Sequence, residues 1–283
     1  MRSFVPEYDL ITAGALEEVL HALQDAWRPI AGGTDLMVLF NAGKLPYRKL
    51  ISVRQTPELR SIDVSDTEVC IGAAVTYTRI REHPVLQSDF PILCETASWT
   101  GSIANQNRGT LGGNIVNASP AADSAPALLA YDAEIELIST RGTRRIPYCN
   151  FHLGYKQMQI REGELLRAIH LPRRSQKCRW YCRKVGPRKA QAISKVCFVA
   201  TADVNGDVVE DIRIAAGSVA PVPLRCFQTE AVIRRERLSS ELIAHATAAI
   251  ADEIQPITDI RSTQEYRRTV TANLLADFLQ SLQ

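Results

Sequence analysis

Two glycine-rich segments carry the residue types best suited to binding a ligand. The first reads Ala31-Gly32-Gly33-Thr34-Asp35 and the second Gly109-Thr110-Leu111-Gly112-Gly113-Asn114. Because glycine has no Cβ, the backbone of such a turn can approach a ligand closely, and its consecutive N–H groups form an anion-binding concavity. A helix that begins directly after the turn adds its positive end. With hydroxyl donors at Thr34, Thr110 and Ser119, two such turns suit a pyrophosphate.

Either glycine pair alone is also compatible with an ordinary tight turn, in which glycine is common. Together, and followed by Asn117-Ala118-Ser119-Pro120-Ala121-Ala122-Asp123, they favour a ligand site. Neither segment has the G-x-G-x-x-G spacing of a Rossmann turn or the G-K-[ST] ending of a Walker loop. A side chain in place of Gly112 is expected to intrude on the phosphate cradle.

Histidine and cysteine form no metal-binding pattern. The five histidines include no His-x-His or His-x-x-x-His pair, and the seven cysteines include no Cys-x-x-Cys pair. Cys178 and Cys182 would share one face of a strand, but an iron–sulfur cluster needs four thiolates, so free thiols are expected. No catalytic triad or carboxylate pair is recognisable. The sequence therefore predicts neither a metal ligand nor a catalytic residue in this chain.

The first glycine turn lies inside a predicted β-α-β unit. Strands are expected over residues 28–31 and 48–53, and the apolar run at residues 36–40 predicts a buried helix between them. An earlier helix has Thr12 as its expected N-cap and an apolar face formed by Leu16, Val19, Leu20 and Leu23.

The remaining elements divide into two sets. Before Pro172, the pattern predicts a strand at 69–73, helices at 78–82 and 91–99, a hairpin of 133–138 with 144–147, and a strand at 165–171. After it come three antiparallel strands (180–185, 196–204 and 208–216), the last two joined at Asn205-Gly206, and helices over 240–254 and 266–282. We therefore predict one domain at 1–175, with subdomains of about 1–58 and 59–175, and a second at 176–283.

Composition and charge exclude several classes of protein. Of the 283 residues, 46% are apolar and 23% charged, which is typical of a globular protein and not of a collagen-like, coiled-coil or disordered chain. A net charge of +2 argues against nucleic-acid binding. The nine Lys and Arg residues within 173–195 fit a solvated strand face, an acidic partner or cofactor phosphates better than single-stranded nucleic acid.

No targeting or membrane segment is expected. Glu7 and Asp9 interrupt any apolar signal core at the start, and no stretch reaches the roughly 20 apolar residues of a membrane helix. The cysteines are odd in number and scattered, which fits reduced thiols better than a disulfide framework. We expect a cytoplasmic protein with no membrane partner.

The glycine segments resemble those of the FAD-binding subunit of molybdenum hydroxylases, the xanthine dehydrogenase and carbon monoxide dehydrogenase family. The resemblance continues through Glu164-Leu165-Leu166, Lys184-Val185-Gly186-Pro187-Arg188, Ala192-Ile193-Ser194-Lys195-Val196 and Glu265-Tyr266-Arg267-Arg268. It implies an α+β fold: a two-part FAD-binding domain of the vanillyl-alcohol oxidase (PCMH) type, followed by a small C-terminal domain with a three-stranded antiparallel sheet and helices.

The resemblance also assigns FAD contacts by position. The FAD pyrophosphate would be wrapped by Pro29, Ile30, Ala31, Gly32, Gly33, Thr34, Asp35 and Leu36, and held from the opposite side by Thr110, Leu111, Gly112, Gly113 and Asn114. Ser119 and Asp123 belong to the segment after the second loop, and Asp123 would contact the adenosine or ribityl region. Leu166 and Lys184 are further flavin contacts. Ile193 would pack on the isoalloxazine ring, with Thr100, next to Trp99, on the other ring face.

One departure from the family pattern matters. Relatives show Gln-Ile-Arg-Asn before the second loop, whereas this chain has Ala104-Asn105-Gln106-Asn107, so the arginine and any salt bridge it makes are absent.

The resemblance implies an electron-transfer subunit. A large molybdopterin-binding subunit would oxidise the substrate, and a small subunit with two 2Fe-2S clusters would relay electrons to the FAD of this chain. The FAD would reduce NAD or another acceptor, and its chemistry would belong to the cofactor. Two alternatives stay open: a stand-alone flavin oxidase of the vanillyl-alcohol type, and a scaffold subunit that has lost FAD.

Overall fold

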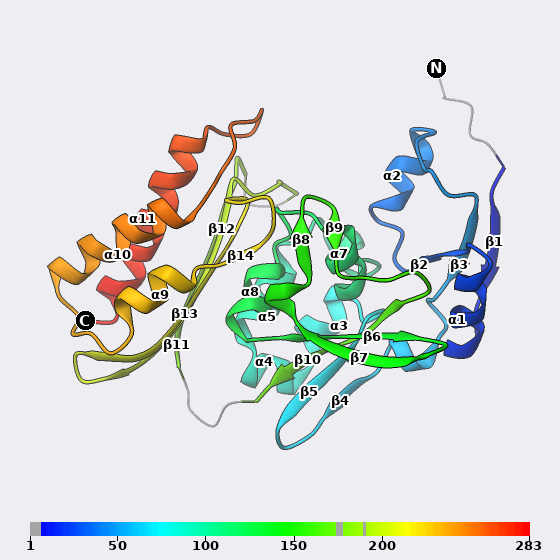
Figure 1. Cartoon of the computed structure of the whole chain (residues 1–283), viewed down its shortest axis with the longest axis horizontal. Helices are drawn as coiled ribbons and strands as arrows, with labels where there is room; N and C mark the ends of the chain where they lie inside the picture. The colour runs from blue at the N-terminus through cyan, green and yellow to red at the C-terminus, as the bar shows by residue number, and fades with distance from the viewer. Residues whose placement is uncertain (1–6, 174–177, 189–190) are drawn as a thin grey trace.

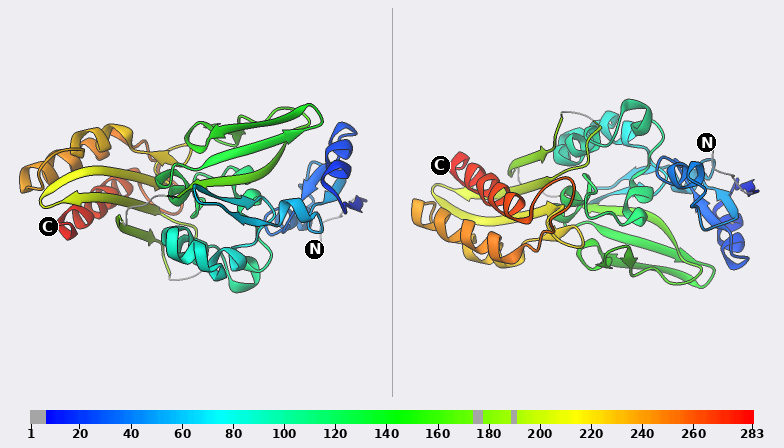
Figure 2. Two further views of the ribbon diagram at one scale, coloured as in Figure 1. Left: turned by 90° about the horizontal axis from the view of Figure 1, so that it is seen from below. Right: turned by 90° about the horizontal axis from the view of Figure 1, so that it is seen from above.

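The computed structural model describes residues 7–173, 178–188 and 191–283. They form three units in a row, with the N-terminal unit at one end and the C-terminal helices at the other (Figure 1, Figure 2). Helices and sheets are mixed in the first two units and a separate antiparallel sheet forms the third, which confirms the predicted α+β class. The domain boundary predicted near residue 175 lies outside the described residues. None of the helices in the described ranges combines the length and apolar character of a bilayer-crossing segment.

The first unit is built on a parallel sheet of order β1-β3-β2 and comprises β1 (Asp9–Thr12), α1 (Leu16–Gln24), β2 (Arg28–Ile30), α2 (Leu36–Asn41) and β3 (Lys49–Ser52). β2 and β3 pair in parallel with α2 between them, as the β-α-β prediction requires. All three strands therefore end at the same edge of the sheet, where the first glycine turn follows β2.

Three details of this unit differ from the prediction. Strand β1 was not anticipated, and Thr12 is its last residue, so the N-cap of α1 is Ala15 instead. Helix α2 forms where expected but buries none of its residues, and Val38 is 65% exposed. The helix lies at the periphery of a sheet only three strands wide (Figure 1), which gives its apolar side chains little to pack against.

The middle unit is an antiparallel sheet of order β4-β5-β10-β6-β7 with helices on one face. Its elements are β4 (Ile62–Val64), β5 (Glu68–Gly72), α3 (Tyr77–Glu82), α4 (Pro84–Asp89), α5 (Pro91–Ser98), α6 (Ile103–Gln106), α7 (Leu111–Asn117), α8 (Ala125–Ala130), β6 (Glu134–Ser139), β7 (Gly142–Pro147), β8 (His152–Gly154), β9 (Gln157–Met158) and β10 (Leu165–Pro172). The alternation in β5, β6 and β10 sends apolar side chains into one core with these helices. The predicted hairpin of β6 with β7 is confirmed.

The C-terminal unit contains β11 (Arg179–Val185), β12 (Val196–Asn205), β13 (Val208–Gly217), β14 (Leu224–Arg225), α9 (Phe227–Ile233), α10 (Ser240–Glu253) and α11 (Gln264–Ser281). The antiparallel sheet is confirmed but has four strands instead of three, because the two-residue β14 pairs with β13. Asn205 pairs with Val208, so the hairpin loop is Gly206-Asp207, one residue later than predicted.

Both faces of this sheet are buried. One face carries Phe198, Ile212 and Ile214, which pack with α9, α10 and α11 (Figure 1). The other carries Val199 and Ala215, which join the core of the middle unit. The C-terminal unit is thus fixed against α5 and α8, and its strands can contribute residues to a site shared with the middle unit.

Candidate functional site

The first glycine turn leaves several backbone N–H groups without an acceptor. It joins β2 to α2, and Gly33 adopts a φ of 72°, a conformation that favours glycine. No acceptor among the described residues is found for the N–H groups of Gly33, Thr34 and Asp35, whereas the carbonyl of Gly33 accepts from Met37 N at 2.9 Å. Three consecutive N–H groups without partners are the anion-binding feature that the sequence predicts.

The two glycine-rich segments meet in space, as predicted. A Cβ on Gly32 would lie 1.9 Å from the carbonyl oxygen of Arg108 and 2.9 Å from the Cα of Gly109, so only glycine fits there. Arg108 Nε also donates to the Gly32 carbonyl at 3.4 Å. Thr34 Oγ1 would lie 3.4 Å from a Cβ on Gly109. The contact brings residues from two units of the fold to one place.

Most N–H groups of the second glycine turn are already bonded within the fold. Leu111 N donates to Val75 O at 3.1 Å, and Gly112 N donates to Ala73 O at 3.0 Å. Gly113 N donates to Thr110 Oγ1 at 3.1 Å, which caps α7. These bonds fix α7 beside β5, and among the described residues no acceptor is found for the N–H group of Thr110, at the start of this turn.

Gly112 is required for packing between α7 and the end of β5. A Cβ on this residue would lie 2.5 Å from the Cβ of Ala73 and 2.7 Å from its carbonyl oxygen. A side chain here would therefore meet the end of β5, and the expectation that it would also intrude on a bound phosphate stays a prediction.

A second part of the site forms around Asp123, where the middle and C-terminal units meet. Lys184 Nζ on β11 lies 2.6 Å from Asp123 Oδ2 and donates to the Trp99 carbonyl at 3.0 Å. Ser194 Oγ donates to Asp123 Oδ1 at 2.5 Å. The side chains of Lys184 and Asp123 are 9% and 10% exposed. Burial raises the pKa of Asp123, and the neighbouring Lys184 ammonium opposes that shift.

Residues predicted for the two faces of a flat ring lie near this cluster. Ile193 precedes Ser194 and is 58% exposed, so its apolar side chain is available to cover a ligand. Thr100 follows Trp99, and its buried Oγ1 has no hydrogen-bond partner among the described residues. The structure thus brings Thr100, Asp123, Lys184 and Ile193 together from four separate segments.

The other residues predicted to contact FAD lie in the core of the middle unit or in the turns that lead to the site. Leu111 and Leu166 are 0% and 3% exposed and belong to the core of the middle unit. Ser119 Oγ accepts from Ala121 N at 3.2 Å and shapes the turn before Asp123. Asn114 Oδ1 accepts from Ser124 Oγ at 2.9 Å. Pro29, Ile30 and Ala31 lead from β2 into the first turn, and Leu36 begins α2.

Gln106, which stands where the family pattern has arginine, is buried, and both polar atoms of its side chain are hydrogen-bonded. Its Nε2 donates to the Ser98 carbonyl at 2.8 Å, and its Oε1 accepts from Arg81 Nη1 at 2.7 Å. A guanidinium is therefore still present at this place, but α3 supplies it. Gln106 and Arg81 thus hydrogen-bond at the segment before the second glycine turn, where the motif arginine is absent.

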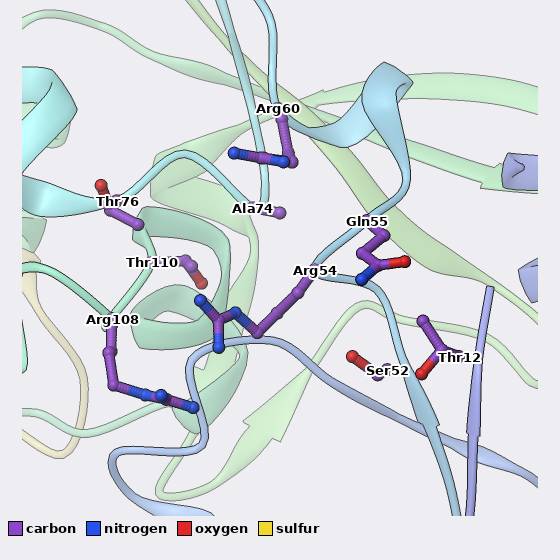
Figure 3. Close-up of a pocket in the computed structure, with 9 residues that line it drawn as sticks. All are labelled: Thr12, Ser52, Arg54, Gln55, Arg60, Ala74, Thr76, Arg108 and Thr110. Carbon is purple, nitrogen blue, oxygen red and sulfur yellow. The ribbon is translucent and has the colours of Figure 1, made fainter. Parts of the chain in front are cut away.

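A cavity of about 390 Å³ opens beside the meeting point of the two glycine segments (Figure 3). It is lined by Thr12, Ser52, Arg54, Gln55, Arg60, Ala74, Thr76, Arg108 and Thr110. Arg54 and Arg108 are not among the site residues predicted from the sequence. The signal was available: Arg54 follows β3, at the same sheet edge as the first glycine turn, and Arg108 directly precedes the second.

Comparison with known proteins places the chain among flavoproteins. Residues 6–174 match the family model described as the FAD binding domain in molybdopterin dehydrogenase, and residues 181–282 match the CO dehydrogenase flavoprotein C-terminal domain. The chain is 29% identical over 273 residues to the putative xanthine dehydrogenase FAD-binding subunit of Escherichia coli (strain K12), with 94% of each chain covered.

Two further similarities extend over nearly the whole chain. The glyceraldehyde dehydrogenase medium chain of Sulfolobus acidocaldarius is 29% identical over 269 residues, which cover 94% of this chain and 95% of that one. A solved structure of carbon monoxide dehydrogenase from Hydrogenophaga pseudoflava superimposes with a TM-score of 0.92 at 24% identity, covering 97% of this chain and 96% of its counterpart. The last similarity establishes that the two chains share a fold.

Proposed function

The chain belongs to the family of FAD-binding domains of molybdopterin dehydrogenases, and we propose that it is the FAD-binding electron-transfer subunit of a multi-subunit molybdenum hydroxylase. As such it is an oxidoreductase component that does not turn over substrate alone. The observation that carries the proposal is the set of unbonded N–H groups at Gly33, Thr34 and Asp35, at the place where the second glycine segment meets the first.

The residues present fit FAD. The unbonded N–H groups of the first glycine turn suit the diphosphate, which carries negative charge between the flavin and adenosine halves. The Lys184–Asp123–Ser194 cluster offers buried polar partners, and the exposed Ile193 offers an apolar surface for the isoalloxazine ring. When bound, FAD supplies the capacity to exchange electrons singly or in pairs.

The proposed partners follow from the names of the relatives. One relative is a medium chain and another a FAD-binding subunit, which are names for parts of larger assemblies. We assign substrate oxidation to a large molybdopterin-binding subunit and electron relay to a small subunit with 2Fe-2S clusters. The acceptor is NAD or another oxidant, and the location is the cytoplasm. No disulfide is formed by Cys70, Cys94, Cys149, Cys182, Cys197 or Cys226, which supports a reducing compartment.

The test is FAD uptake by the purified full chain. We expect a yellow protein with about one FAD per chain and a flavin that dithionite reduces. Purine added together with NAD+, with the partner subunits absent, is expected to give no oxidation of the purine. A chain that takes up no FAD would reject the proposal. Substrate oxidation by the isolated chain would reject the subunit assignment and support a stand-alone oxidase.

A further inference from the structure

The junction between the middle and C-terminal units contains a buried arginine, Arg225 on β14, whose side chain is 6% exposed. Its Nη1 donates to the Leu129 carbonyl at 2.7 Å and to Asp132 Oδ1 at 2.6 Å, and both partners belong to the middle unit. Its Nε and Nη2 donate to the two carboxylate oxygens of Glu230 on α9. One guanidinium therefore connects the end of helix α8 to an element of the C-terminal unit.

The C-terminal sheet adds two bonds to this connection. Arg213 Nε on β13 lies 2.9 Å from the other carboxylate oxygen of Asp132, so two neighbouring strands each direct an arginine at that residue. Glu230 Oε1 accepts from the N–H of Ile214 at 2.7 Å, which fixes the carboxylate that orients Arg225. We call Asp132, Arg213, Arg225 and Glu230 the junction clamp.

The buried charges of the clamp are better suited to fixing a position than to stabilising the junction. Glu230 is 1% exposed, and burial raises the pKa of its carboxyl, a shift that the Arg225 guanidinium opposes. Taking two charges out of water has a free-energy cost that apolar side chains of similar volume avoid, so a buried pair is weak evidence for stability. The planar guanidinium, however, fixes both the distance and the direction of its partners.

Helix α8 connects the clamp to the Lys184–Asp123 cluster. It spans Ala125–Ala130 and packs against the C-terminal sheet (Figure 1), with Asp123 two residues before it and Asp132 two residues after it. All six of its residues are buried, so a displacement at one end is transmitted to the other. At the start of the helix, Asp123 lies 2.6 Å from Lys184 Nζ. The place where α8 is held therefore determines where this carboxylate lies.

We propose that Arg225 is a positioning residue for the Lys184–Asp123 cluster: by holding α8 to the C-terminal unit, it fixes the Asp123 carboxylate opposite Lys184. The inference rests on the proposed function, which assigns a flavin to this cluster, and adds to it a residue at the far end of α8. Because Arg225 acts through Asp123, its replacement should alter FAD binding only in a chain that has this carboxylate.

The experiment measures the FAD dissociation constant and the visible absorption spectrum of the bound flavin in the full chain. Arg225→Lys keeps the charge but loses the planar fork that reaches both sides of the junction, so we expect about tenfold weaker binding and a shifted spectrum. Asp132→Asn, at a side chain that is 43% exposed, is a milder variant expected to act in the same direction. The matched control is Asp207→Asn, in the exposed ion pair of Asp207 with Arg237, and it should change neither quantity.

A double-mutant cycle with Asp123→Asn tests the route of action. In the Asp123→Asn chain, Arg225→Lys should cause little further loss of FAD affinity, because the carboxylate that it positions is already absent. Losses that add in full would show that the two residues act independently and would contradict the inference.

A neutral form of the clamp separates position from stability. Arg225→Met combined with Glu230→Gln removes both buried charges, and the amide oxygen at residue 230 can still accept from Ile214 N. We expect a melting temperature that is unchanged or higher, with weaker FAD binding and a shifted spectrum.

The results distinguish failure of the inference from failure of the proposed function. If the unmodified chain binds FAD and the clamp variants bind it with the original affinity and spectrum, whatever their melting temperatures, the clamp is only structural and the inference is overturned while the proposed function stands. If the unmodified chain binds no FAD, the proposed function fails and the inference fails with it.

Discussion

Gly32 and Gly112 lack a side chain for two different reasons. At Gly32 a Cβ would collide with the backbone of Arg108 and Gly109, so the glycine permits the contact between the two loops that form the candidate site. At Gly112 a Cβ would collide with Ala73, so the glycine permits α7 to pack on the end of β5. Glycine thus permits the contact between the two loops of the candidate site in the first segment, and core packing in the second.

The role of Gly112 predicts a loss of stability that does not require FAD. Gly112→Ala should lower the free energy of unfolding of the flavin-free chain by about 1–3 kcal/mol, the usual cost of overpacking. Urea denaturation measures it. Gly14→Ala is the control, because its nearest neighbour is Glu18 Oε2 at 3.9 Å, and little change is expected. A Gly112→Ala chain of unaltered stability that no longer binds FAD would instead place Gly112 against the ligand.

At the scale of elements, helix α11 is connected to the site through one buried arginine. Arg267 is 2% exposed, and its Nη1 donates to the carbonyls of Lys195 and Ser218 at 2.9 and 2.8 Å. Ser218 in turn donates from N to the Pro120 carbonyl and from Oγ to the Ser194 carbonyl. The chain of bonds joins the two loops that carry Asp123 and Ile193, so the start of α11 sets their spacing.

This arrangement predicts that Arg267 positions the flavin site without touching it. Arg267→Lys keeps the charge but cannot span both carbonyls and Asp259, which Nη2 contacts at 2.8 Å. We expect FAD affinity to fall about tenfold and the visible spectrum of the bound flavin to shift. Arg268→Lys, an exposed neighbour on the same helix, should change neither. A variant that melts earlier but binds FAD with the original affinity and spectrum would limit Arg267 to a structural role.

Local sequence patterns predicted most elements but not what packs against them. The hairpin of β6 with β7 and helix α10 were predictable, because alternation, turn residues and an N-cap at Ser239 agree there. Helix α2 was predicted in the right place but wrongly buried, since burial depends on neighbours that five consecutive apolar residues do not specify. Strand β14 is only two residues long, which is too short to show the alternation of apolar and polar residues that predicts a strand.

The candidate site was predictable where a motif is contiguous and not where distant segments supply the partners. The first glycine turn could be identified because its residues are consecutive. The bonds from Leu111 and Gly112 to Val75 and Ala73 could not, because the acceptors come from a different element. Arg54 was missed for the same reason: its position beside Arg108 depends on how the first two units pack. The domain boundary near residue 175 stays a prediction.

At the scale of the whole molecule, the proposed FAD site extends across both junctions between the three units. The glycine turn and the arginine-lined cavity lie at the first junction, and the Lys184–Asp123 cluster lies at the second. An extended dinucleotide is suited to such an arrangement, because its charged and flat parts need different surroundings. The C-terminal sheet is buried on both faces, so it holds Lys184 and Ser194 at fixed positions relative to Asp123.

The most direct test is a crystal structure of the full chain with FAD. We predict diphosphate oxygens within hydrogen-bond distance, 2.7–3.2 Å, of the N–H groups of Gly33, Thr34 and Asp35. The isoalloxazine ring should lie between Ile193 and Thr100, beside Lys184. A diphosphate bound away from the first glycine turn, or a flavin ring remote from the Lys184–Asp123 cluster, would contradict the account.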